Sequence, residues 1–252
     1  MAEFYPASGY PASKAELAKF RGMGGPLNRF LQTFAYKDRV FFFDDFLGDT
    51  INLDNYALAN SGGAGAANFA IQVLRSGVIR SATGTTDDGS LSLIGPAIWY
   101  GDANCGMEIR FKYDVVTGYN TEVGFAAAVP GSNASAVTDI DTPTVLDETA
   151  VLQIDTDQTL TTLAFATGGT SFTDTATTVT GTTVLTAATY AIVRIQLIGN
   201  MAACWINGYR EAVHSGDKVE GGNPLALWVY SRTRNTTTKL LDIDYVAMWQ
   251  DR

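Results

Sequence analysis

Hydrophobic and polar residues alternate through most of this chain with the two-residue period of half-buried β-strands. The apolar runs are short, and turn residues such as Asp87-Asp88-Gly89 separate them. After an entering strand at about 40–43, we expect strands at 69–74, 77–82, 91–94, 107–115, 121–128, 150–155, 160–166, 190–198, 201–207, 225–231 and 239–249. This many short strands, without an internal helix, predict two antiparallel sheets packed face to face.

The N-terminal residues follow a different pattern. Two Tyr-Pro-Ala-Ser repeats come first, and each proline favours an extended backbone that cannot form a core of its own. Ser13 and Glu16 have the spacing of a helix capping box, and a second short helix is predicted from Pro26. We therefore divide the chain into an extended, partly helical arm at 1–40 and a β-sandwich at 41–252.

Charge is distributed unevenly between these two parts. The 252 residues include 17 basic and 26 acidic side chains, for a formal charge of −9. Residues 1–43 hold six of the basic and three of the acidic side chains, which leaves 11 basic and 23 acidic ones, or −12, for the rest. An acidic body repels nucleic acid, and no apolar run reaches the roughly 20 residues that span a bilayer. We expect neither nucleic acid nor a membrane as a partner.

The sequence offers little for catalysis. His214 is the only histidine, and we expect it in a polar surface loop rather than in a catalytic dyad. Jelly rolls that cleave glycans carry acids as Glu-x-Asp-x-Glu on one strand, and the nearest analogue, Asp242-Ile243-Asp244, is better explained by structural hydrogen bonds. Glu108 and Glu122 could face each other across neighbouring strands. We therefore predict a protein that is not an enzyme.

Metal and thiol chemistry are equally sparse. The acidic loops Asp87-Asp88-Gly89 and Asp139-Ile140-Asp141 contain oxygen ligands that Ca²⁺ prefers, but each is explained as a turn. Cys105 and Cys204 lie in apolar strand-like segments, so we expect buried free thiols, with a disulfide as the alternative. No cofactor and no metal ion are predicted.

A family resemblance rests on residues 190–208. One strand runs over 190–198, Gly199-Asn200 turns the chain, a second strand runs to Trp205, and Asn207-Gly208 suits a tight type I′ turn. This arrangement resembles the concanavalin A-like jelly roll of laminin G and lectin-like sandwiches. An early Phe43-Asp44-Asp45-Phe46 and a late Leu241-Asp242-Ile243-Asp244-Tyr245-Val246 match strands that pair in that fold. The resemblance implies an all-β, two-sheet antiparallel jelly-roll sandwich.

Within that superfamily the chain looks most like virion proteins of tailed bacteriophages, which carry such a jelly roll after an N-terminal arm. The resemblance implies a non-enzymatic capsid decoration (cement) protein that is made in the host cytoplasm and located on the capsid surface of the virion. Its partners would be the major capsid protein and neighbouring copies of itself, in a homo-oligomer with a trimer favoured.

The arm would then supply the assembly interface through aromatic and basic side chains that order on contact. These side chains are Tyr5, Tyr10, Phe20, Arg21, Arg29, Phe30 and Phe34. A solvated tail is the alternative interpretation of the same segment.

The alternative function is a glycan-binding receptor-recognition module of a phage tail or head fibre. Segments 129–149 and 167–186, rich in small polar residues, would supply its contact loops, and a host glycan would be the partner. Aromatic rings that could stack on sugars are Trp99, Tyr100, Tyr119, Trp228 and Tyr230, although aromatic residues in strands usually pack in the core. A glycoside hydrolase is a third class, disfavoured by the missing carboxylate motif.

Overall fold

The structure, a computed structural model, describes residues 39–72, 77–114, 117–127, 134–139, 144–145, 147–156, 163–179, 185–199, 201–216 and 219–252. Within these ranges the chain consists of β-strands and one 3₁₀ turn, η1 (Gly101–Ala103). No helix in the described part is long and apolar enough to cross a membrane. The predicted arm at 1–40 lies outside the described residues up to position 38.

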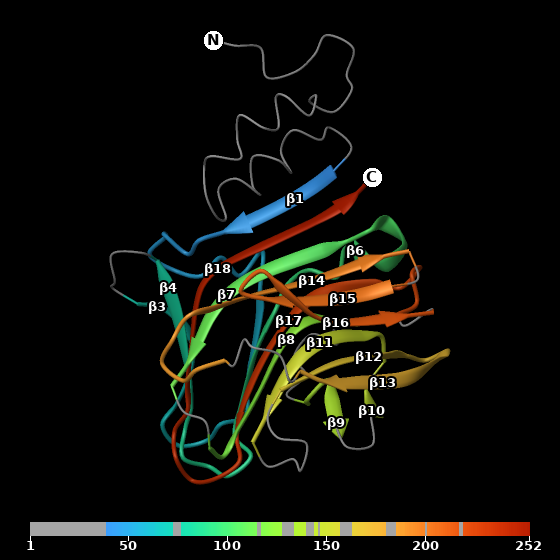
Figure 1. Cartoon of the computed structure of the whole chain (residues 1–252). Coiled ribbons are helices and arrows are strands. Elements are labelled where there is room, and N and C mark those ends of the chain that lie inside the picture. The colour runs from blue at the N-terminus through green and yellow to red at the C-terminus, as the bar shows by residue number, and fades with distance from the viewer. Residues whose placement is uncertain are drawn as a thin grey trace, which may run out of the picture.

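Two antiparallel sheets form a sandwich (Figure 1). Sheet A has the order β16 (Tyr209–Ser215), β15 (Met201–Ile206), β14 (Ala191–Ile198), β7 (Gly106–Tyr113), β18 (Leu240–Asp251), β4 (Val78–Thr83) and β3 (Ala66–Gln72), with β1 (Arg39–Asp44) paired to β18. Sheet B has the order β13 (Phe172–Thr178), β12 (Ala164–Gly169), β11 (Thr149–Asp155), β8 (Tyr119–Ala126), β17 (Pro224–Thr233), β5 (Ser90–Ile94) and β2 (Ala57–Asn60), with β6 (Trp99–Tyr100) paired to β17. A separate short hairpin joins β9 (Val137–Asp139) and β10 (Thr144–Val145).

Strand alternation explains how the sandwich is held together. On β14, Val193, Ile195 and Leu197 are buried in the core, while the residues between them are partly exposed. Val123 and Phe125 of β8 reach the same core from the other sheet. Removing this apolar surface from water is the main force that holds the two sheets together. The predicted fold class, a two-sheet antiparallel jelly roll, is confirmed.

The structure also confirms the features that carried the resemblance. Asn207 and Gly208 both have positive φ, at 49° and 89°, as a type I′ turn requires, and they join β15 to β16. The early strand pairs with the late one, because Phe43 lies opposite Ala247 and Asp44 opposite Val246 (Figure 1).

Six observed strands lie outside the predicted strand ranges, namely β2, β6, β9, β10, β13 and β16. β13 lies in the segment 167–186, and β16 includes His214, which we had expected in a surface loop. In β16 the inward positions are Ala212 and His214, while Val213 is exposed, so hydrophobicity does not reveal which face is buried. Pairing with β15 forms the strand instead.

The outward face of sheet A carries ion pairs that join three strands. Asp242 on β18 is 2% exposed and accepts bonds from Arg80 on β4 at 2.5 and 2.8 Å, and Lys112 on β7 lies 3.0 Å away. Asp244 pairs with Arg110. Burial by itself raises the pKa of Asp242, but its bonds to Arg80 and Lys112 outweigh burial and hold the pKa below its usual value. These two acids are structural, as their sequence context indicated.

Replacing Asp242 with Asn should therefore destabilise the sandwich in a pH-dependent way. A lowered pKa in the folded state means that the carboxylate stabilises the fold above its unfolded pKa of about 3.8, and that this is lost as pH falls through the folded pKa. At pH 7 we expect Asp242→Asn to lower the free energy of unfolding by about 3 kcal/mol, because the substitution leaves Arg80 and Lys112 without their shared carboxylate. Urea unfolding at pH 7 and at pH 2 measures the free energy of unfolding, and the difference between variant and wild type should be smaller at pH 2. An equal gap at both pH values would contradict this account.

Candidate functional site

The candidate site lies on the outer face of sheet B, the face turned away from the sandwich core. Strand register places polar side chains there in two rows. Tyr230, Glu122 and Gln153 lie side by side on β17, β8 and β11. One step along the same strands, Arg232, Asn120 and Asp155 form the second row. Buried polar groups need partners, so this face is organised by hydrogen bonds as well as by packing.

Glu122 is at the centre of this arrangement and is fully buried. Its carboxylate accepts hydrogen bonds from Ser135 Oγ, from the backbone N–H of Ala136 at 2.8 Å and of Val137 at 3.2 Å, from Gln153 Nε2 at 3.3 Å and from Trp228 Nε1 at 2.7 Å. Burial raises the pKa of Glu122, and the hydrogen bonds offset only part of that effect. The raised pKa means that this carboxyl group holds a proton more tightly than an exposed glutamate does.

Three of these donors belong to the segment 135–137, which enters the β9–β10 hairpin. Val137 and Val145 of this hairpin pack with Val151 and Trp228 in a second apolar cluster on the outer face of sheet B. The hairpin therefore covers the middle of the face and encloses Glu122. A pocket lies on each side of it.

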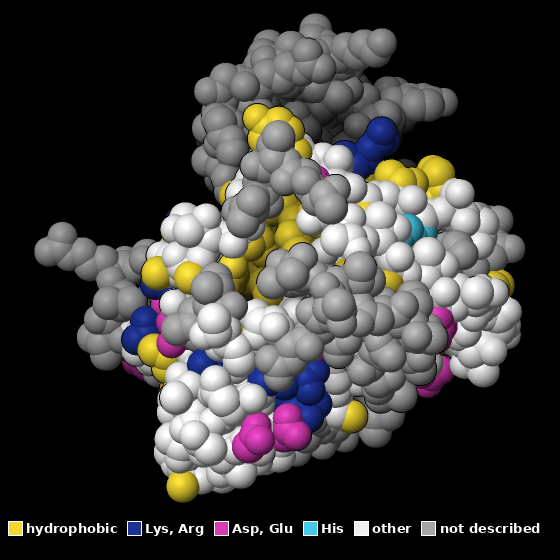
Figure 2. Space-filling view, turned by 60° about the horizontal axis from the view of Figure 1, so that its bottom comes forward, with side chains coloured by type: hydrophobic (Ala, Val, Ile, Leu, Met, Phe, Trp, Pro, Cys, Tyr) yellow, Lys and Arg dark blue, Asp and Glu magenta, His cyan; other side chains and the backbone are white. Residues whose placement is uncertain are grey.

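The first pocket, here the arginine pocket, has a volume of about 370 Å³, within the range of small-ligand sites. Its lining consists of Ser61, Asp88, Ser90, Ala134, Ser135, Val137, Tyr230, Arg232 and Arg234. Arg232 Nε donates to Asp88 Oδ1 at 2.9 Å, and Arg234 pairs with the buried Asp155. In Figure 2, basic and acidic side chains stand next to each other on the face turned forward.

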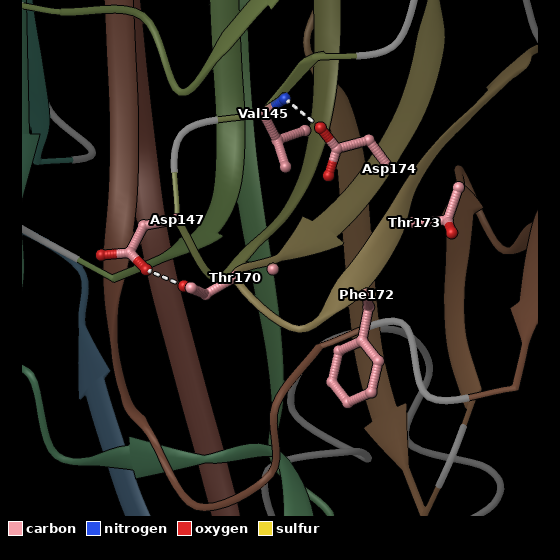
Figure 3. A pocket seen from close by; sticks show the side chains of 7 residues that line it. Val145, Asp147, Thr170, Phe172, Thr173 and Asp174 are labelled. Atoms are coloured by element: carbon pink, nitrogen blue, oxygen red, sulfur yellow. Dashed lines mark hydrogen bonds between the residues drawn. The ribbon is translucent and has the colours of Figure 1, made fainter.

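The second pocket, here the edge pocket, has a volume of about 510 Å³ and lies by the turn between β12 and β13. Figure 3 shows its carboxylates held in place: Asp147 accepts from Thr170 Oγ1 at 2.9 Å, and Asp174 accepts from the Val145 N–H at 3.0 Å. The ring of Phe172 also lines the pocket (Figure 3). An aromatic ring beside fixed carboxylates and hydroxyls can contact both the apolar face and the hydroxyl groups of a sugar.

The sequence-derived aromatic candidates for glycan contact are mostly inside the protein. Trp99, Tyr119, Trp228 and Tyr230 are 1%, 0%, 3% and 1% exposed, whereas Tyr100 is 37% exposed. Trp228 and Tyr230 stack on each other with ring centroids 6.0 Å apart, under the hairpin. Burial thus leaves Tyr100 as the one of the five rings that a sugar could reach directly.

The predicted arm contacts fall outside the described residues. They are Tyr5, Tyr10, Phe20, Arg21, Arg29, Phe30 and Phe34. The arm interface and the homo-oligomer therefore stay predictions.

His214 and the cysteines have structural surroundings. His214 is 4% exposed, not at the surface as expected, and its two ring nitrogens lie 2.7 and 2.9 Å from the hydroxyls of Thr167 and Thr177 on sheet B. Cys105 and Cys204 are both free and buried, as predicted. In the described part of the chain, no three His, Cys, Asp or Glu side chains gather closely enough to hold a metal ion.

Sequence reasoning missed most of the site. It considered Glu122 only as a partner for Glu108, but these residues lie on β8 and β7, which belong to different sheets. It did not single out Asp155, Arg232 or Arg234. Side chains alternate between the two faces of a strand, so Glu122 and Asp155 each point away from the core residues of their strands. This alternation is the one sequence signal that could have identified them as residues of the outer face.

No protein-family model matches this sequence, and no curated protein matches it. Solved structures do match. LamA from Zobellia galactanivorans, solved with laminaritriose and laminaritetraose, has 13% identity and a TM-score of 0.58, over 85% of this chain and 99% of that one. The β-glucanase of Bacillus licheniformis has 12% identity and a TM-score of 0.55, over 84% and 98%. The Emp47p carbohydrate recognition domain has 12% identity and a TM-score of 0.52, over 84% and 95%.

These matches correct the functional prediction. Further matching structures include a lichenase and a glycosyl hydrolase family protein, so enzymes that cleave glycans predominate among them. The predictions of a non-enzymatic capsid decoration protein and of a protein that is not an enzyme were therefore wrong, and nothing in the matches indicates a bacteriophage origin. The chain has the concanavalin A-like jelly-roll fold that these glucanases share.

The central position of Glu122 leads to a stability prediction. Glu122→Gln leaves one acceptor oxygen where there were two, and its amide N–H₂ group faces other hydrogen-bond donors. We therefore expect the free energy of unfolding to fall by about 3 kcal/mol. Urea unfolding measures the loss, and limited proteolysis should show faster cleavage near 134–139. Asp147→Asn, an exposed carboxylate with one hydroxyl donor, is the control and should change stability by less than about 1 kcal/mol. An unchanged unfolding midpoint for Glu122→Gln would show that the hairpin is held mainly by packing.

Proposed function

We propose that this protein is a carbohydrate-active enzyme that hydrolyses glycosidic bonds on the outer face of sheet B. The observation that carries the proposal is a pair of carboxyl groups there with unlike surroundings. Glu122 is buried with a raised pKa, while Asp155 is paired with Arg234 and accepts from Asn120 Nδ2 at 3.1 Å. The fold shared with glucanases supports the assignment.

The two carboxyl groups suit the two roles that glycoside hydrolysis needs. One group must donate a proton to the leaving oxygen, and a raised pKa prepares Glu122 for that role. The other must activate water or attack the sugar, and the ion pair with Arg234 holds the Asp155 carboxylate in place for that role.

The strand register brings the two carboxyl groups to the same face. Glu122 lies opposite Gln153, so Asp155 is its diagonal neighbour on the adjacent strand. Two acids on neighbouring strands of one face can act on the same glycosidic bond.

Catalysis at this site also requires movement of the hairpin. Residues 135–137 bind the Glu122 carboxylate from the solvent side, and the side chain has no exposed surface. A glycan that enters from the flanking pockets must therefore replace these donors with its own hydroxyl groups before proton transfer.

Hydrolysis can be tested with the full chain against a panel of β-glucans, mucin-type glycans and acidic polysaccharides, by release of reducing ends. We expect turnover on at least one substrate, and a loss of about 100-fold or more for Glu122→Gln and for Asp155→Asn, because each removes an acid–base group. Asp244→Asn, which breaks an ion pair on sheet A, is the matched control and should keep its rate. All variants are assayed below their unfolding temperatures. Full activity in both site variants would refute the proposed roles.

A second candidate function is glycan recognition without cleavage at the edge pocket. The enclosure of Glu122 by five donors favours it, as does a fold shared with a carbohydrate recognition domain. In this case the Phe172 ring and the carboxylates of Asp147 and Asp174 would hold the sugar.

Calorimetric titration with oligosaccharides separates the two functions. Recognition at the edge pocket predicts that Phe172→Ala weakens binding about tenfold, because an aromatic stacking contact contributes roughly 0.5–1.5 kcal/mol, while Glu122→Gln leaves the affinity unchanged. If Phe172→Ala binds as tightly as wild type, the edge pocket is not the recognition site.

A further inference from the structure

We propose that the arginine pocket recognises the anionic group of an acidic sugar, either a uronate carboxylate or a sulfate ester. This inference rests on the proposed function, because it names the class of glycan that the same face of sheet B takes. The chemistry follows from the two guanidinium groups that line the pocket and from the carboxylate that already occupies one of them.

Asp88 shows what the pocket binds. It comes from the turn before β5, its side chain is 58% exposed, and its Oδ1 accepts from both Nε and the Nη2 atom of Arg232, at 2.9 and 2.5 Å. Arg234 Nη1 lies 4.0 Å from the same oxygen. Two nitrogens of Arg232 thus contact one carboxylate oxygen at the rim, with the Arg234 guanidinium close by, and arginine is the side chain best suited to bind carboxylates and other oxyanions.

A ligand could displace Asp88 without disturbing the fold. Asp88 is exposed in a turn, with a positive φ of 62°, and its carboxylate is bound on one side only. Arg234 would remain in place, because its side chain is 16% exposed and is held from below by the buried Asp155. Its Nε is a buried donor with no acceptor among the described residues. An oxyanion that replaced Asp88 would therefore meet a fixed cation.

The remaining lining is suited to a sugar. Ser61 is exposed and places a hydroxyl group at the pocket, whereas Ser90, Ser135 and Tyr230 form its buried floor. The Ser61 hydroxyl can donate to and accept from a hydroxyl group of a pyranose ring. The chain carries a net charge of −9, so without these arginines its field would repel an anionic glycan.

The pocket also lies at a useful distance from the carboxyl pair. Tyr230 is opposite Glu122, and Arg232 is two residues further along β17, which is about 7 Å at the rise of a β-strand. A sugar whose anionic group binds Arg232 would therefore place its neighbour beside Glu122. This makes the pocket a specificity subsite rather than the catalytic position.

Matched ligand pairs test the inference. Calorimetry on the full chain compares an oligogalacturonate with its carboxyl-reduced, neutral counterpart, and a sulfated galactan oligosaccharide with its desulfated form. We expect one charged member to bind at least tenfold more tightly than its neutral partner, with a preference that declines as salt increases. The pair that shows the preference identifies the anionic group as carboxylate or sulfate.

Two variants with opposite expected effects on ligand affinity distinguish recognition of the anionic group from a general loss of structure, which would weaken binding in both. Arg232→Gln should abolish the preference for the charged ligand, whereas Asp88→Asn, which removes the competing carboxylate and tolerates the left-handed turn, should strengthen charged-ligand binding several-fold. Equal binding within both ligand pairs, or no gain in Asp88→Asn, overturns the inference. Cleavage or binding of neutral glycans alone would overturn it while leaving the proposed function intact. If no glycan of either kind binds or is cleaved, both fail.

Discussion

The outer face of sheet B depends on one interaction, the enclosure of the Glu122 carboxylate by donors from three directions. Trp228 and Gln153 approach it from the neighbouring strands, and the backbone of 136–137 approaches it from the hairpin above. A buried carboxyl group is costly unless such donors satisfy it. The same bonds that make its burial tolerable therefore also hold the hairpin on the sheet.

The position of the hairpin determines where a ligand can bind. Because Val137 and Val145 occupy the middle of the face, the open volume is divided into an arginine pocket next to β5 and β17 and an edge pocket next to β12 and β13. The two pockets differ in charge, since guanidinium groups line the first and carboxylates line the second. A glycan bound as proposed would meet a different set of contacts on each side of Glu122.

Residue patterns along the sequence were a poor guide to the polar face of sheet B. The nearest acid pair on a single strand, Asp242 and Asp244, lies on sheet A and is held by Arg80, Lys112 and Arg110. The acids on the outer face of sheet B come from two strands, Glu122 from β8 and Asp155 from β11, whose paired residues are 23 to 35 positions apart in the sequence. A motif that is assembled between strands has no fixed spacing in the sequence.

The sequence by itself determined the fold class, the sites of most core strands and the type I′ turn at Asn207-Gly208. These features depend on local alternation and on backbone conformations that particular residues favour. Only the tertiary structure decided that β16 is a strand, that His214 is buried, and that Arg232 and Arg234 share a pocket with Asp88. The physical reason is that strand pairing and sheet order bring distant residues together, and local sequence preferences do not specify which strands become neighbours.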